Sequence, residues 1–102
     1  TLDRSSAASD VYKEGIVYRI AATNTFTSKS LTNVTVNDDS VNWSSQKGTY
    51  QSGSILTGTN QATGSITSTP SGTPNTGAVV ANFPTIAAGN TGTLQFIVKI
   101  NP

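Results

Sequence analysis

The sequence LQFIVKI, residues 94–100, carries a large apolar side chain at every second position. Successive side chains of a β-strand point to opposite faces of a sheet, so this period of two predicts a strand with one face against a core. The apolar face consists of Leu94, Phe96, Val98 and Ile100. The opposite face is mixed, which indicates that it is only partly covered.

The same alternation recurs earlier in the chain. One face is formed by Ile16, Tyr18, Ile20 and Ala22, and another by Thr32, Val34 and Val36. Further strands are expected at 78–83 and, less regularly, at 49–51, 54–56 and 64–69, with turn-forming residues at 37–40, 70–75 and 87–90. The chain is therefore predicted to be all-β, an immunoglobulin-like antiparallel β-sandwich of about seven or eight strands.

The length of 102 residues suits a single core, and residues 11–102 are predicted to form one sandwich domain. Residues 1–10 are small and polar apart from Leu2, and we interpret them as an N-terminal tail, a linker or a donor-like strand. Such a strand can pair with the exposed sheet edge of a neighbour by β-strand addition. The charged fraction of 11% also lowers the desolvation cost of packing subunits together.

Composition excludes several classes of function. The net charge is +1 and the Lys and Arg residues are scattered, so there is no basic stripe for nucleic acid. The absence of His and Cys excludes Ser-His-Asp and Cys-His nucleophilic catalysis and ordinary zinc sites. No apolar run approaches the roughly 18 to 20 residues that span a bilayer. We expect a protein without enzymatic activity, cofactor or membrane span.

Two regions carry recognisable motifs. Residues 14–38 contain EGIVYRI, a TNT bend and the strand TNVTVND, and residues 82–100 contain NFPTIAAG before the final strand. In this order and spacing the motifs resemble the DUF11 family of conserved surface-protein repeats. The chain departs from that pattern at Phe26, where a small residue is usual, after Asp38, where Leu-Pro is missing, and in the longer, more polar region 52–75.

The resemblance implies an immunoglobulin-like sandwich outside the cell or at the cell surface, often in tandem arrays, and it supplies no catalytic residues. We therefore expect a structural extracellular domain, either a spacer or repeat of a microbial cell-surface protein or a subunit of an extracellular filament. Its partners are then neighbouring domains or identical subunits. The alternative is a carbohydrate- or calcium-dependent adhesive binding module that contacts surface glycans.

Asp38 and Asp39 are the only adjacent carboxylates. In an extended segment their side chains diverge to opposite faces, which is unsuitable for a paired acid and base. Together with Asp3, Asp10 or Glu14 they could supply oxygen ligands to Ca²⁺. The alternative is an Asx turn at the strand end, and no recognised Ca²⁺-loop pattern is present.

Three kinds of modification or binding residue remain as hypotheses. Asn33 and Asn42 each begin an Asn-X-Ser/Thr sequon, a pattern that also arises by chance in a chain rich in Asn, Thr and Ser. Lys13 and Asn101 are candidates for an isopeptide bond between end strands, although their polar surroundings favour two exposed terminal residues. The aromatic residues are expected mainly in the core, with a sugar-stacking platform as the alternative; they are Tyr12, Tyr18, Phe26, Trp43, Tyr50, Phe83 and Phe96.

Overall fold

The computed structural model describes residues 5–12, 15–44 and 48–100. Its elements are β1 (Ser5–Tyr12), β2 (Gly15–Thr23), β3 (Leu31–Asp39), α1 (Val41–Ser44), β4 (Gly48–Ile55), β5 (Ser65–Ser68), β6 (Ala78–Ile86) and β7 (Thr91–Ile100). Within these ranges the only helix is the single turn α1, and no helix is long and apolar enough to cross a membrane. The all-β prediction is confirmed.

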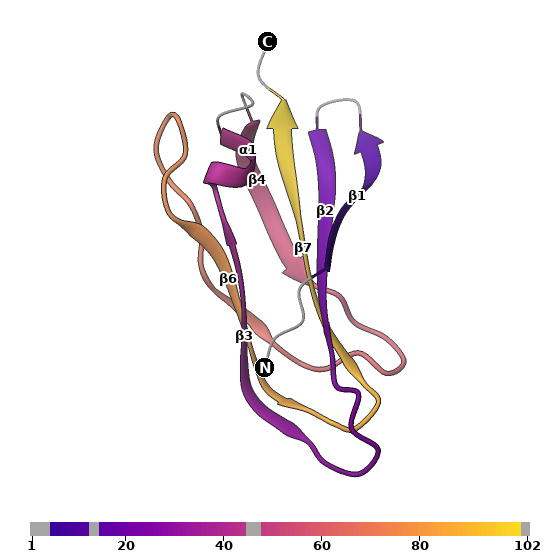
Figure 1. Cartoon of the computed structure of the whole chain (residues 1–102). Helices are drawn as coiled ribbons and strands as arrows, with labels where there is room; N and C mark the ends of the chain where they lie inside the picture. The colour runs from indigo at the N-terminus through magenta and orange to yellow at the C-terminus, as the bar shows by residue number, and fades with distance from the viewer. Residues whose placement is uncertain (1–4, 13–14, 45–47, 101–102) are drawn as a thin grey trace.

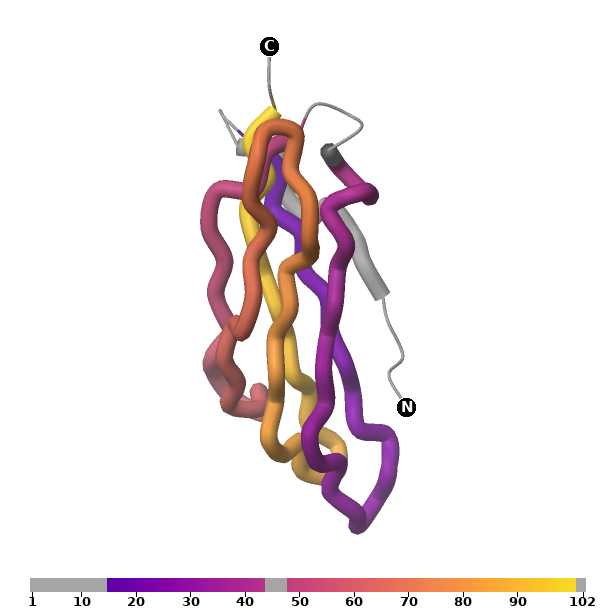
Figure 2. Tube along the Cα trace, turned by 90° about the vertical axis from the view of Figure 1, so that its left-hand side faces the viewer, coloured from indigo at the N-terminus to yellow at the C-terminus, as the bar shows by residue number. Residues whose placement is uncertain are grey.

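The strands form two antiparallel sheets that pack face to face as a β-sandwich. Over the described residues one sheet has four strands in the order β1-β2-β7-β4, and the other has three in the order β3-β6-β5. Figure 1 shows both sheets running along the long axis of the molecule, which measures 48 × 24 × 18 Å. Figure 2, turned by 90°, shows the same elongated body with the β2–β3 loop at its lower tip.

Strands β2 and β7 supply the centre of the core because their alternating patterns match. They pair antiparallel over their whole described length, so Tyr18 lies opposite Phe96 and Ile20 opposite Leu94. The predicted inward faces of both strands are confirmed at these positions. The buried core consists of Ile20, Ala22, Val36, Trp43, Ala62, Val79, Ala81, Phe83, Ile86, Leu94, Phe96 and Val98.

Strand β3 departs from the predicted alternation. Val36 is buried as expected, but Thr32 is exposed, and Leu31 packs against the core instead. This change of face occurs at Asn33, whose φ of 52° is in the left-handed region. Asn33 lies across from Pro84, between the cross-strand pairs Thr32–Thr85 and Val34–Phe83. A left-handed residue within a strand disrupts the pleat, so the inward face moves by one position.

Strand β4 joins the two expected strands at 49–51 and 54–56 into one. The register with β7 shifts between Tyr50, opposite Val98, and Ser52, opposite Ile97. This bulge adds one residue to β4, so Tyr50 faces the core and Ser52 faces outward. The irregularity explains why the sequence shows no continuous period of two here.

Ile100, expected on the apolar face of the last strand, is 48% exposed. It continues the inward series of Val98, but its cross-strand neighbour on β4 is Gly48, which has no side chain to cover it. At the opposite edge of the sheet, β1 pairs with β2 of the same chain. Its exchange with a neighbour stays a prediction, as does the single-domain boundary at residue 11.

Candidate functional site

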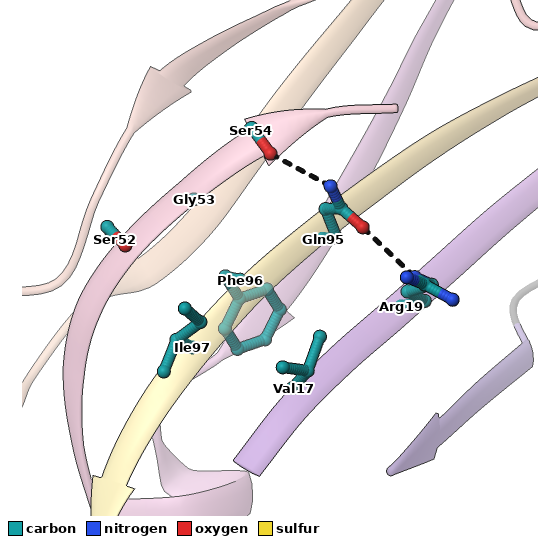
Figure 3. Close-up of a pocket in the computed structure, with 8 residues that line it drawn as sticks. All are labelled: Val17, Arg19, Ser52, Gly53, Ser54, Gln95, Phe96 and Ile97. Carbon is teal, nitrogen blue, oxygen red and sulfur yellow. Dashed lines mark hydrogen bonds between the residues drawn. The ribbon is translucent and has the colours of Figure 1, made fainter. Parts of the chain in front are cut away.

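A shallow groove of about 300 Å³ lies on the outer face of the four-stranded sheet, across β4, β7 and β2 (Figure 3). Its floor is β7, and its sides are the outward residues of the two flanking strands. The lining residues are Val17, Arg19, Ser52, Gly53, Ser54, Gln95, Phe96 and Ile97.

A polar ladder crosses the groove from strand to strand. Arg19 Nε donates to Gln95 Oε1 at 3.0 Å, and Gln95 Nε2 donates to Ser54 Oγ at 3.1 Å. The register explains this, because Arg19 pairs with Gln95 on one side and Gln95 with Ser54 on the other. Since Gln95 uses both ends of its amide, the ladder fixes the orientation of the exposed Arg19 guanidinium.

The other half of the groove is apolar. Val17 and Ile97 lie opposite each other on β2 and β7, and Val17 is only 6% exposed although it faces away from the core. The groove thus joins an aliphatic patch to a positively charged, hydrogen-bonding edge. Such a surface can bind a ligand or chain that offers both apolar contact and acceptor oxygens.

The groove has no group suited to proton transfer at neutral pH. Its lining residues include one permanent cation, Arg19, and no carboxylate. A second hollow of about 290 Å³ is lined by the loop residues Ile55, Thr57, Gly58, Gln61, Ala62, Thr63 and Gly64. Both hollows provide contact surfaces, and neither lining contains an acid–base pair.

The two adjacent carboxylates diverge as the sequence predicted. Asp38 is 2% exposed and accepts a hydrogen bond from Asn42 Nδ2, whereas Asp39 is exposed and accepts one from the Val41 backbone N–H at 3.0 Å. Asp39 therefore makes an Asx-type contact at the start of α1. In the described part of the chain no three acidic residues gather as a metal-binding group.

The two glycosylation candidates lie apart from the groove. Asn33 and Asn42 are both exposed, but the Asn42 amide is engaged with Asp38, whereas Asn33 has a turn-like backbone that presents it to solvent. A glycan on Asn42 would replace one of the two hydrogens on the nitrogen that donates to the buried Asp38 carboxylate. The isopeptide candidates Lys13 and Asn101 lie outside the described residues.

The aromatic residues form one internal cluster around Phe96. Its ring centroid lies 5.5 Å from that of Tyr18, 5.2 Å from that of Trp43 and 6.1 Å from that of Tyr50. Burial raises the pKa of Tyr50 above its ordinary value. Phe26, by contrast, is exposed in the β2–β3 loop. The rings of Tyr18, Trp43, Tyr50 and Phe96 therefore pack together within the sandwich, and the sugar-stacking platform stays a hypothesis.

One buried asparagine organises the lower end of the sandwich. Asn24 is fully buried. Its Nδ2 donates to the Lys29 carbonyl at 2.7 Å and to the Ile86 carbonyl at 2.8 Å. Its Oδ1 accepts from the Phe26 N–H at 2.9 Å. The Thr-Asn-Thr motif predicts a bend at Asn24, but it does not reveal these buried hydrogen bonds. An Asn between two threonines at a strand end was the available signal.

A second buried asparagine organises the upper end. Asn75 Oδ1 accepts from the Tyr50 backbone N–H at 2.7 Å and from Trp43 Nε1 at 3.5 Å, and Nδ2 donates to the Gly72 carbonyl at 2.9 Å. The segment 70–75 was predicted only as a loop. Asn75 in fact ties that loop to β4 and to α1.

Comparisons with protein-family models, with curated proteins and with solved structures find no match to this chain.

Proposed function

We propose that this domain is a structural unit of a microbial surface protein or of an extracellular filament. The observation that carries the proposal is an elongated sandwich, 48 Å long, in which each described buried side-chain nitrogen or oxygen has a hydrogen-bond partner. Complete pairing of buried polar groups specifies one rigid packing. Rigidity over a long axis is what a spacer or fibre subunit requires.

The proposed relation to immunoglobulin-like domains is one of architecture. In the immunoglobulin constant type the last strand joins the sheet of the third and sixth strands. Here the last strand, β7, lies between β2 and β4, and the fifth strand, β5, lies beside β6. The exchange of β5 and β7 between sheets keeps two antiparallel layers and a shared core.

Localisation tests the proposal. Immunogold labelling of intact cells of the source organism should decorate the outer surface or extracellular fibres. Labelling that appears only after permeabilisation would contradict an extracellular role. Negative-stain microscopy of the purified chain, with and without residues 1–10, separates the two forms: fibres lost on truncation indicate a subunit linked by strand exchange, and monomers in both cases indicate a spacer.

A second candidate function, an adhesive module for carbohydrate, is favoured by the groove. The ladder of Arg19, Gln95 and Ser54 offers exposed hydrogen-bonding groups beside the aliphatic pair. Binding to a glycan array that falls on Arg19→Ala and persists on Lys99→Ala would support it. Binding equally retained in both variants would place the contact elsewhere, and a parallel titration tests Ca²⁺ dependence.

A further inference from the structure

Among the residues whose burial the structure describes, three large apolar side chains are exposed: Phe26 at 53%, Val41 at 64% and Ile100 at 48%. They lie at opposite ends of the long axis. The β2–β3 loop, which carries Phe26, forms the lower tip, whereas α1 and the end of β7 lie at the upper end (Figures 1 and 2). With 48 Å along this axis, the two ends of one molecule cannot cover each other.

The lower pole, which we define as Phe26 and Lys29, is held by a rigid loop. Asn24 accepts from the backbone N–H of Phe26 and donates to the carbonyl of Lys29, so the loop conformation is fixed from inside. Both side chains are exposed. An aromatic side chain presented by a fixed backbone has little conformational entropy left to lose on binding.

The upper pole, which we define as Asp39, Val41 and Ile100, combines two aliphatic side chains with a carboxylate. Asp39 Oδ1 accepts from the Val41 N–H at 3.0 Å, which holds the acid beside the exposed valine. Lys99 alternates to the outer face of the sheet, away from Ile100. Among the residues whose side chains the structure describes, both poles thus carry exposed apolar groups, with a cation on the lower pole and a carboxylate on the upper pole.

We propose that the upper pole of one copy binds the lower pole of a second copy of this chain, with Phe26 against Val41 and Ile100, and Lys29 facing Asp39. Because the poles are different surfaces at opposite ends, the contact is heterologous and repeats along an axis instead of closing a dimer. The inference rests on the proposed structural function and adds the surfaces that join successive copies.

The size of the end faces sets the strength of this contact. Each end measures 24 × 18 Å, which is well below the roughly 800 Å² that each partner of a standard stable interface buries. Free copies therefore associate weakly. Copies that are linked in one chain, or already aligned in a fibre, hold the two poles at a high effective concentration. The same weak contact is then formed most of the time.

Cysteine trapping tests the pairing, since the chain has no cysteine of its own. Ser28→Cys, an exposed position in the β2–β3 loop that leaves Phe26 in place, is made in one preparation and Val41→Cys in another. One of the two is affinity-tagged, and they are mixed under mild oxidation. Docking brings the two thiols together repeatedly, so at high protein concentration the mixed disulfide should form several-fold faster than it does in the control mixture. The matched control replaces Val41→Cys by Thr35→Cys, an exposed position midway along β3. Equal rates in all mixtures would overturn the proposal.

A charge test uses variants that preserve the local backbone contacts. Asp39→Asn keeps the oxygen that accepts from Val41, and Lys29→Gln leaves the carbonyl bound by Asn24 unchanged. Either change should reduce the excess trapping rate several-fold, and added salt should do the same. Undiminished trapping in both variants would refute the charge pairing. If immunogold labelling finds the protein at the cell surface but disulfide trapping shows no preference for the poles, this inference fails and the proposed function stands. If trapping is selective for the poles but the protein is found inside cells, the proposed function fails and the pole contact stands.

Discussion

Replacing Gly92 by alanine tests how tightly the core is packed around Phe83. A Cβ at Gly92 would lie 2.7 Å from Phe83 Cδ1 and 2.8 Å from its Cγ. The Phe83 ring is fully buried and also meets Gly64, where an added Cβ would lie 2.5 Å away. Neither glycine has a positive φ, so the obstacle is the ring and not the backbone conformation.

The expected cost follows from two opposing effects. Gly→Ala within a strand normally stabilises a protein by about 0.5–1 kcal/mol through lower chain entropy. Forcing a methyl group into a filled core costs about 1–3 kcal/mol. The clash at Gly92 is with a ring that has no open side, so we expect a net loss of about 1–2 kcal/mol. For a domain of this size that corresponds to a fall in Tm of roughly 4–16 °C.

Urea unfolding followed by the fluorescence of Trp43, the single tryptophan, measures the change. A double-mutant cycle with Phe83→Leu isolates the contact, because the smaller side chain leaves room for the added methyl group. Gly92→Ala should cost less in the Phe83→Leu variant than in the native chain. Equal penalties in both backgrounds, or a stabilised Gly92→Ala variant, would refute the packing argument.

Three further changes have defined outcomes. Asn24→Asp replaces two donors by an acceptor against the Lys29 and Ile86 carbonyls, and should lower the free energy of unfolding by about 2–3 kcal/mol in the same assay; an unchanged midpoint would contradict the role of the amide. Asn75→Ala removes the acceptor of the Tyr50 N–H and should increase hydrogen exchange in loop 70–75 and α1, while exchange in the β2–β3 loop stays at the native rate. The raised pKa of Tyr50 means that the unfolded chain loses this proton first, so stability falls as pH rises above about 10. Tyr50→Phe should remove that part of the alkaline loss, and an identical pH profile for both proteins would rule out the assignment.

The parts of the fold that the sequence predicts best are those in which burial alone determines the pattern. Strands β2 and β7 were both predicted at the right place because one face of each lies in the core, at Ile20, Leu94 and Phe96. The face change in β3 depends on the φ of Asn33, a backbone property that the side-chain pattern 32–36 does not contain. The bulge in β4 likewise depends on pairing with β7, which a local reading of Ser- and Gly-rich sequence cannot reveal.

The candidate site was less accessible to sequence reasoning than the fold. Arg19, Ser54 and Gln95 are separated by 35 to 76 positions and become neighbours only through the strand register. Asp38 and Asn42 illustrate the opposite case, since a spacing of four residues across a strand end and a helical turn brings them together. The divergence of Asp38 and Asp39 could be predicted because it follows from local strand geometry.

The pairing order of the large sheet determines how the domain responds to a pulling force. Both β1 and β7 run antiparallel to β2, so they point in the same direction. Tension applied between the start of β1 and the end of β7 draws these two strands along their axes in opposite senses. The force passes from β1 through β2 to β7. Within each of these two ladders the hydrogen bonds lie perpendicular to the strands, so they are loaded in shear and must yield together, and the weaker ladder sets the force that the domain resists. Unfolding by peeling, in which bonds break one after another at low force, is avoided for a load along this axis.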